Sequence, residues 1–183
     1  MDDPDLELVE ATGRGDQRAF ESLVKRYQRP LLNFITRFGV QYHAEDIAQE
    51  VFLRIYRAAS RFQARAKVST WIFQIAYNLT LTDIKRRKRQ RNLNETLPQN
   101  REESAEDHTS KTIESYQLEE EIAVALGRLP DNQRAALLLR VNEGLSYREI
   151  GAILRVSIQS VESLLFRART SLKRYINRDK RSL

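Results

Sequence analysis

Near the C-terminus, polar and basic side chains follow one another at the spacing that a DNA-reading helix requires. Residues 157–174 place small polar side chains first and cations after them, on the side of a helix opposite to Val161, Leu165, Ala168 and Leu172. The first turn of such a helix can hydrogen-bond to base edges in the major groove, and the cations behind it can contact phosphates. The pattern predicts DNA contacts from Gln159, Ser160, Ser163, Arg167 and Arg174.

A shorter helix must hold this one in place, and the residues just before it supply the signals. Ser146 and Glu149 have the spacing of a capping box, which predicts that the shorter helix begins at Tyr147. Gly151 has no side chain where the two helices must cross, and Ser157 can cap the longer helix. The turn contains Arg155, where a backbone at positive φ would cost on the order of 1 kcal/mol. We therefore predict a helix-turn-helix with an uncommon turn residue.

Two amphipathic helices joined by a short turn also occur in proteins that bind no nucleic acid, so charge must help to decide. Residues 1–91 carry 17 Lys/Arg and 11 Asp/Glu, residues 92–121 carry 2 and 9, and residues 122–183 carry 12 and 5. Two basic blocks that flank an acidic one are expected of two polyanion-binding modules joined by a segment that avoids DNA. This distribution favours DNA binding over a purely structural role.

A second basic segment, residues 61–91, mixes cations with aromatic rings. Its end, KRRKRQR at 85–91, holds six cations in seven residues, and the loop 61–67 adds more. Cations beside rings on which bases can stack are typical of a site for single-stranded or melted DNA. The rings in question are Phe62, Trp71, Phe73 and Tyr77. The alternative is a solvated helix end above core aromatics, and we favour a core position for Trp71 and Tyr77 taken singly.

The helix expected from about Ala44 to Ser60 has a different outward face. Its apolar stripe comprises Ile47, Ala48, Val51, Phe52, Ile55 and Tyr56, and the other side carries Asp46, Gln49, Glu50, Leu53 and Arg57. DNA would repel these carboxylates, although they lie in a basic part of the chain. The face is either ordinary solvated surface or a docking site for a protein partner.

Composition excludes several classes of protein. The 183 residues include no cysteine, so disulfides and thiolate zinc sites are excluded. The two histidines, His43 and His108, are each expected at the surface rather than as metal ligands. No phosphate loop, nucleophile–base set or metal-ligand spacing is present, so we predict no enzyme, no cofactor and no metal. No apolar run approaches the about 20 residues that span a bilayer, and the acidic N-terminus is unlike a signal peptide. We expect a cytoplasmic protein without membrane insertion.

Helical periodicity runs through the rest of the chain, and no strand pattern appears. Further helices are expected after Gly15-Asp16, continuing beyond Pro30, and from about Ser69 to Arg89. After an acidic, polar stretch the helical period resumes near Tyr116, and Leu129-Pro130 is expected to end that helix. Asp131 is expected to cap the helix that follows, and Gly144 is expected to end it. The fold class expected is all-α: two small helical domains joined by a flexible acidic linker. The boundaries are 1–91, 92–117 and 118–183.

These segments resemble, in order and in composition, a bacterial alternative sigma factor of the extracytoplasmic-function group of the sigma-70 family. The resemblance rests on AFESLVKRY, DIAQEVFLRIYR, STWIFQIAYN, LPDNQRAALLLR and LSYREIGAIL…SVESLLFRAR, and it extends from about Gly15 to Ile176. It implies a protein without catalysis of its own that binds core RNA polymerase, through its largest and second-largest subunits, and promoter DNA. An anti-sigma factor is a further implied partner.

The resemblance also implies a role for each segment. Core polymerase would bind Asp46, Gln49, Glu50, Leu53, Arg54 and Arg57. The melted −10 element would bind the N-terminal domain through Arg61, Phe62, Arg65, Lys67, Trp71, Asn78, Lys85, Arg86 and Arg87. The −35 element would bind Arg148, Arg155, Ser157, Gln159, Ser160, Glu162, Ser163, Arg167 and Lys173.

Three residues depart from the pattern of this group, and one alternative function stays open. Arg155 replaces a frequent turn glycine, Glu162 stands where a cation is common, and Leu164 stands where arginine is common. Base contacts therefore cannot be transferred from relatives. The alternative is a free-standing helix-turn-helix regulator, which would occupy promoter DNA without polymerase.

Overall fold

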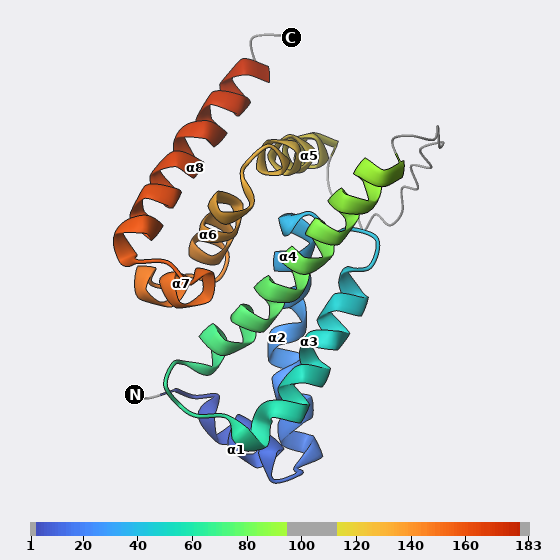
Figure 1. The fold of residues 1–183 in the computed structure, drawn as a ribbon, viewed down its shortest axis with the longest axis vertical. Helices are drawn as coiled ribbons and strands as arrows, with labels where there is room; N and C mark the ends of the chain where they lie inside the picture. The colour runs from blue at the N-terminus through green and yellow to red at the C-terminus, as the bar shows by residue number, and fades with distance from the viewer. Residues whose placement is uncertain (1–2, 95–112, 180–183) are drawn as a thin grey trace.

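The computed structural model describes residues 3–94 and 113–179, and these ranges contain helices and no strand. The N-terminal half consists of α1 (Leu6–Gly13), α2 (Gln17–Phe38), α3 (Ala44–Ala58), the 3₁₀ turn η1 (Ala59–Arg61) and α4 (Val68–Asn94). The C-terminal half consists of α5 (Ile113–Gly127), α6 (Asp131–Val141), α7 (Tyr147–Leu154) and α8 (Ile158–Asp179). Figure 1 shows α2, α3 and α4 side by side, with α6, α7 and α8 grouped beside α4. The all-α prediction is confirmed; most of the predicted linker, 95–112, lies outside the described residues.

The acidic N-terminus forms a helix that the sequence pattern did not predict. Asp5, just before α1, accepts a hydrogen bond of 2.5 Å from the Tyr27 hydroxyl and pairs with Arg26 on α2. Asp3 accepts a hydrogen bond of 2.6 Å from the backbone N–H of Val68, at the start of α4. A carboxylate at a helix N-terminus satisfies an otherwise unpaired donor and interacts favourably with the helix dipole. The acidic residues therefore hold the N-terminal segment across two helices.

The long helix α2 begins after Gly15-Asp16 and continues beyond Pro30, as its sequence predicts. Asp16 caps it by accepting from the backbone N–H groups of Arg18 and Ala19 at 2.9 and 3.2 Å. Pro30 lies inside the helix without ending it. Gly39 follows Phe38 in the left-handed region with φ 116°, a conformation that only glycine adopts without strain.

The two halves share one apolar cluster and several polar contacts. In sequence order the buried residues run from Val9 on α1 to Ala168 on α8, and α7 packs against α4 while α6 packs against α2. The Tyr77 hydroxyl donates to the Asn132 side-chain oxygen at 2.8 Å, and the Gln74 amide donates to the Ala152 carbonyl at 3.1 Å. The helix-turn-helix therefore packs directly on the long basic helix.

Two predictions about the ends of α6 are wrong. Asp131 is the first residue of the helix and makes no side-chain cap, because Pro130 occupies the capping position. The helix ends at Val141 with Asn142 as its cap, and Gly144 lies further along the loop with φ 64°. A proline without an N–H is well suited to a helix start, where that donor would be unpaired. Among the described residues, none of the helices is both apolar and long enough to cross a membrane.

Candidate nucleic-acid interface

The helix-turn-helix has the internal geometry that the sequence predicts. Ser146 and Glu149 form a complete capping box, with the Ser146 N–H donating to Glu149 at 2.7 Å and the Glu149 N–H donating to Ser146 Oγ at 3.3 Å. A Cβ on Gly151 would lie 2.9 Å from the Val156 carbonyl oxygen and 3.7 Å from a Val161 methyl. No real Cβ is tolerated at the first distance, so α8 crosses α7 where it does because position 151 lacks a side chain.

Arg155 adopts the strained conformation expected of it. Its backbone has φ 57° and ψ 47°, and it is the one non-glycine residue at positive φ in the part of the chain that the structure describes. The Ser157 hydroxyl then accepts the Ser160 N–H at 3.2 Å, which starts α8 with a side-chain cap. Both features place the first turn of α8 at a defined angle to α7.

The predicted base-reading face of α8 is exposed. The residues of this face that the structure exposes are Gln159, Ser160, Glu162, Ser163, Arg167, Lys173 and Arg174. The Ser163 hydroxyl donates to the Gln159 carbonyl at 3.1 Å, so it retains acceptor capacity. Phe166, 71% exposed beside Arg167, was not predicted as a surface residue. Arg148 on α7 is exposed as well.

The aromatic residues around α4 divide into a core pair and a surface pair. Phe73 and Tyr77 are 2% and 5% exposed, so these rings cannot stack on bases, and the core interpretation favoured for Tyr77 is confirmed. Phe62 and Trp71 are half-buried, with ring centroids 4.7 Å apart, so the core position favoured for Trp71 holds only in part. This pair, at the junction of the loop and α4, is the aromatic surface that remains available to a base.

The cations of residues 61–91 are in three different situations. Among the residues of the loop and α4 predicted to bind DNA, the exposed ones are Arg61, Arg65, Lys67, Asn78, Lys85 and Arg86, and Lys88, Arg89 and Arg91 are exposed cations as well. Lys67 and Lys88 pair across to the C-terminal half, with Glu149 at 3.0 Å and Asp131 at 3.6 Å. Arg87 turns toward Asp83 and His43.

The pair between Lys67 and Glu149 changes the acidity of the capping-box carboxyl. Burial opposes ionisation of Glu149, but hydrogen bonds from Ser146 and Lys67 outweigh it and lower the pKa of this carboxyl. Glu149 therefore stays ionised and serves two purposes, because it caps α7 and also holds the loop before α4 against the helix-turn-helix.

The outward face of α3 is acidic with one apolar side chain at its centre. Asp46 and Gln49 are exposed, and Glu50 accepts a hydrogen bond of 2.8 Å from Arg54 one turn later. Leu53 is 48% exposed, and Arg57 is exposed beyond it. The face presents carboxylates and an aliphatic group together.

Two predictions of burial near α3 are corrected by the structure. Tyr56, predicted to face the core, is 45% exposed and meets the Phe20 ring edge-on at 5.0 Å, so that prediction is wrong. His43, expected at the surface, is half-buried because it packs toward Asp83 of α4. His108 lies outside the described residues.

Besides Asp5, two further buried charged residues were missed from the sequence. Asp83 and Arg134 are each 8% exposed, and Arg134 donates to the carbonyl oxygens of Phe38, Gly127 and Leu129 at 2.8, 2.6 and 3.0 Å. The helical period could have indicated their burial, because both residues occupy positions at which the neighbouring turns of the helix carry apolar, inward-facing residues. Within residues 3–94 and 113–179, no group of three or more His, Cys, Asp or Glu side chains is placed to hold a metal ion.

The chain is similar to known proteins over nearly its whole length. The family model for sigma-70 region 2 matches residues 23–90, and the model for sigma-70 region 4 matches residues 119–172. The RNA polymerase sigma-H factor of Pseudomonas aeruginosa is 35% identical over 92% of this chain and 91% of its own. The ECF RNA polymerase sigma-E factor of Escherichia coli K12 is 33% identical over 92% of each. Among solved structures, CnrH in complex with the cytosolic domain of CnrY matches with a TM-score of 0.73 and 26% identity, over 97% of this chain and 99% of that one.

Proposed function

This chain belongs to the extracytoplasmic-function group of the sigma-70 family, and on that premise we propose which of its surfaces carries out each part of promoter-specific transcription initiation. A sigma factor binds core RNA polymerase and directs it to promoter DNA. The assignments below concern the residues of this chain.

The acidic face of α3 is the polymerase-docking surface. Asp46 and Glu50 carry negative charge in a half of the chain whose loop 61–67 and α4 end are basic, so DNA phosphates are repelled from this face. Leu53 adds exposed aliphatic area at the centre of the carboxylates, which is typical of a protein–protein contact with an apolar centre and a charged rim. The remaining residues of the face are Gln49, Arg54 and Arg57.

The loop 61–67 and α4 receive the melted −10 element. The Phe62–Trp71 pair supplies the ring surface for an unstacked base. Asn78, exposed on the same helix, can hydrogen-bond to a base edge. Cations along the path of the single strand contact its phosphates; these cations are Arg61, Arg65, Lys67, Lys85 and Arg86.

The first turns of α8 read the −35 element as a duplex. Small or flexible polar groups stand at the helix start, and Arg167 and Lys173 follow for the phosphates. Arg148 and Arg155 flank the entry. Glu162 is an acceptor within this face and suits a cytosine amino group. The polar groups at the start are Ser157, Gln159, Ser160 and Ser163.

The observation that carries the assignment is the separation of charge between the outward face of α3, where Asp46 and Glu50 lie beside exposed Leu53, and the basic loop 61–67 and end of α4. A free-standing DNA-binding regulator has no use for an acidic, partly apolar helix face held rigidly against its basic helix. The protein acts without catalysis of its own, in the cytoplasm where the polymerase is, and an anti-sigma factor restrains it. The last assignment is supported by a fold neighbour, a sigma factor from Bartonella quintana bound to an anti-sigma factor, with a TM-score of 0.69 and 21% identity.

Charge reversal on α3 tests the docking assignment. Asp46→Lys with Glu50→Lys should weaken the affinity of the full chain for core polymerase by about tenfold or more, which corresponds to ~1.4 kcal/mol per factor of ten. Glu21→Lys on the exposed side of α2 is the matched control, and it should bind core normally. If the control weakens core binding as much as the α3 variant, or the α3 variant binds core normally, the docking assignment is wrong.

A further inference from the structure

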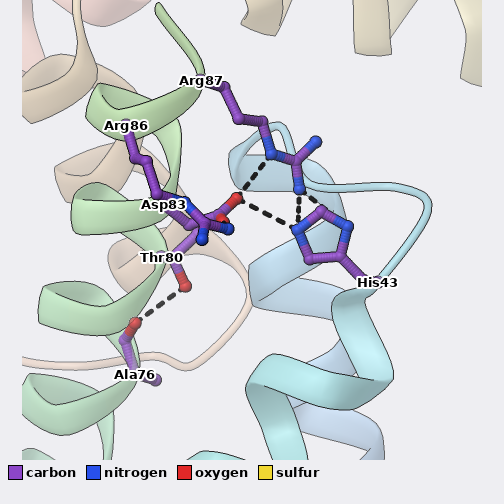
Figure 2. A network of polar contacts seen from close by, with 6 residues as sticks. All are labelled: His43, Ala76, Thr80, Asp83, Arg86 and Arg87. Carbon is purple, nitrogen blue, oxygen red and sulfur yellow. Dashed lines mark hydrogen bonds and ion pairs between the residues drawn. The ribbon is translucent and has the colours of Figure 1, made fainter. Parts of the chain in front are cut away.

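The basic end of α4 contains one acidic residue, and that residue is buried. The Asp83 carboxylate accepts from Arg87 Nε at 2.7 Å and from Arg86 Nη2 at 2.9 Å, both on the same helix. It also lies 3.2 Å from Nε2 of His43, the residue just before α3. Figure 2 shows the carboxylate between the two arginines and the imidazole ring. A buried carboxylate requires such partners, because it loses its hydration on folding.

Arg86 and Arg87 are neighbours in sequence but differ in what they contact. The side chain of Arg86 is 71% exposed, and its contact with Asp83 is a single hydrogen bond from the turn of its own helix. The side chain of Arg87 is 31% exposed, and its guanidinium contacts both Asp83 and the His43 ring. Arg87 therefore reaches from α4 to the start of α3 (Figure 2), whereas the Arg86 side chain is mostly exposed and, among the described residues, makes polar contacts only within its own helix.

The imidazole of His43 keeps this link in either neutral form. When Nε2 carries the proton, the ring donates to Asp83; when Nε2 lacks it, the ring accepts from Arg87. One of the two contacts is always available. The start of α3 is thus tied to the basic end of α4 by a closed set of polar and charged groups.

From this geometry we infer that Asp83 is a positioning residue, which determines which cations of residues 85–91 are available to contact DNA. It retains Arg87 as a tie between α3 and α4 and leaves Arg86, with Lys85, to contact the phosphates of the melted strand. The inference rests on the proposed function of α4, and it removes Arg87 from the DNA contacts that the sequence predicts. A phosphate that drew Arg87 outward would break its 2.7 Å ion pair with buried Asp83 and its contact with the His43 ring, which opposes that movement.

The tie has a functional consequence for the two surfaces that it joins. The polymerase-docking face of α3 begins at Asp46, three residues after His43. The strand-binding cations Lys85 and Arg86 follow Asp83 directly on α4. The relative position of the two surfaces is therefore set before polymerase or DNA binds. A preorganised arrangement loses less conformational entropy on binding than one that must be ordered.

The salt dependence of strand binding distinguishes a phosphate contact from a tie. Each phosphate neutralised on a single strand contributes about −0.7 to the slope of log affinity against log salt concentration. The full chain is titrated with a fluorescent single-stranded DNA of mixed sequence over a range of NaCl concentrations. We expect Arg86→Ala and Lys85→Ala each to make the slope shallower by about 0.7, and Arg87→Ala to leave it unchanged. Asp83→Asn should make the slope steeper, because it frees Arg87.

Each outcome has one meaning. If Arg87→Ala reduces the slope as much as Arg86→Ala does, Arg87 contacts phosphate and the inference is wrong, although the proposed function stands. If none of the four variants changes the slope, Lys85 and Arg86 do not contact the strand, and the −10 contacts proposed for these two residues fail together with the inference. Thermal unfolding of each variant shows that it folds; should Asp83→Asn fail to fold, the comparison of Arg86→Ala with Arg87→Ala decides the question alone.

Discussion

The guanidinium of Arg134 on α6 donates a hydrogen bond of 2.8 Å to the backbone carbonyl of Phe38, the last residue of α2. The same side chain binds two carbonyls of its own half, at the end of α5 and just before α6, and lies over the Phe38 ring. Helix ends leave carbonyl groups without intrahelical partners, and a cation there also complements the helix dipole. Arg134 therefore joins the C-terminal half, which carries the helix-turn-helix, to the half that carries the acidic face of α3.

Removing this side chain should destabilise the fold. Arg134→Ala leaves three carbonyls without their donor in a buried place, and we expect a loss of about 2–4 kcal/mol in the free energy of unfolding, measured with urea. Arg134→Lys should recover only part of it, because an ammonium group cannot span the same carbonyls. Arg18→Ala, on exposed α2 surface, should change stability by less than about 0.5 kcal/mol. Equal stability of the Arg134→Ala and Arg18→Ala variants would contradict the role given to Arg134.

Glu143, in the loop between α6 and α7, should make stability depend on pH. It lines a pocket of about 340 Å³ with Asn142 and with Arg29, Pro30, Asn33 and Arg37 of α2. Burial raises the pKa of Glu143 from 4.5 to about 7. The folded chain then binds this proton more tightly than the unfolded chain, so the stabilisation is complete below pH 4.5 and is lost as pH rises toward 7.

Substitution of Glu143 by the neutral isostere should remove that dependence. Glu143→Gln should be more stable than the parent chain at pH 8 and equally stable near pH 4.5, in thermal unfolding recorded at both pH values. Glu10→Gln is the matched control, because Glu10 is exposed on α1, and it should show no such difference. A Glu143→Gln variant that is less stable at pH 8 would refute the raised pKa.

Arg155 should show opposite effects on stability and on DNA binding. Glycine adopts φ 57° without strain, so Arg155→Gly should raise stability by on the order of 1 kcal/mol, or about 2–4 °C in the melting temperature. The same change removes a cation at the entry to α8, so the affinity for duplex promoter DNA should fall, with a salt slope shallower by about 0.9. A variant that is both more stable and unaltered in DNA binding would remove Arg155 from the −35 contacts.

Specificity and affinity should separate along α8. Gln159→Ala or Ser160→Ala should change which −35 sequences the holoenzyme selects from a randomised library, at a cost of about 1–3 kcal/mol for the preferred base. Arg167→Ala should weaken binding to all −35 sequences by the same factor and make the salt slope shallower by about 1. If Gln159→Ala lowers the affinity for all sequences equally and leaves the selected sequences unchanged, Gln159 does not take part in base recognition.

Local signals in the sequence predicted the helix-turn-helix in detail, because its determinants are local. The capping box at Ser146, the crossing at Gly151 and the cap at Ser157 each involve residues a few positions apart, and the structure confirms all three. The strain at Arg155 was predicted for the same reason.

What the sequence did not predict depends on distant partners. Asp3 and Asp5 look like a solvated acidic terminus until Val68 and Tyr27 are seen beside them. Asp83 and Arg134 are charged residues on otherwise apolar stripes, and each has a partner far away in the sequence, at His43 and Phe38. Periodicity identifies which face is buried but not which buried charge meets which acceptor. The roles of the individual DNA-binding and docking residues remain predictions for the same reason.

We expect the two DNA-binding surfaces to act together only when core polymerase holds the chain. Footprinting of a promoter selected from genomic DNA, with the chain alone, with core polymerase alone and with both, tests this directly. Protection of both promoter elements, strand opening at −10 and transcript synthesis should require the chain and core together, and the Asp46→Lys, Glu50→Lys variant should restore none of them. Tight, two-element protection by the chain alone, with no initiation when core is added, would contradict this function.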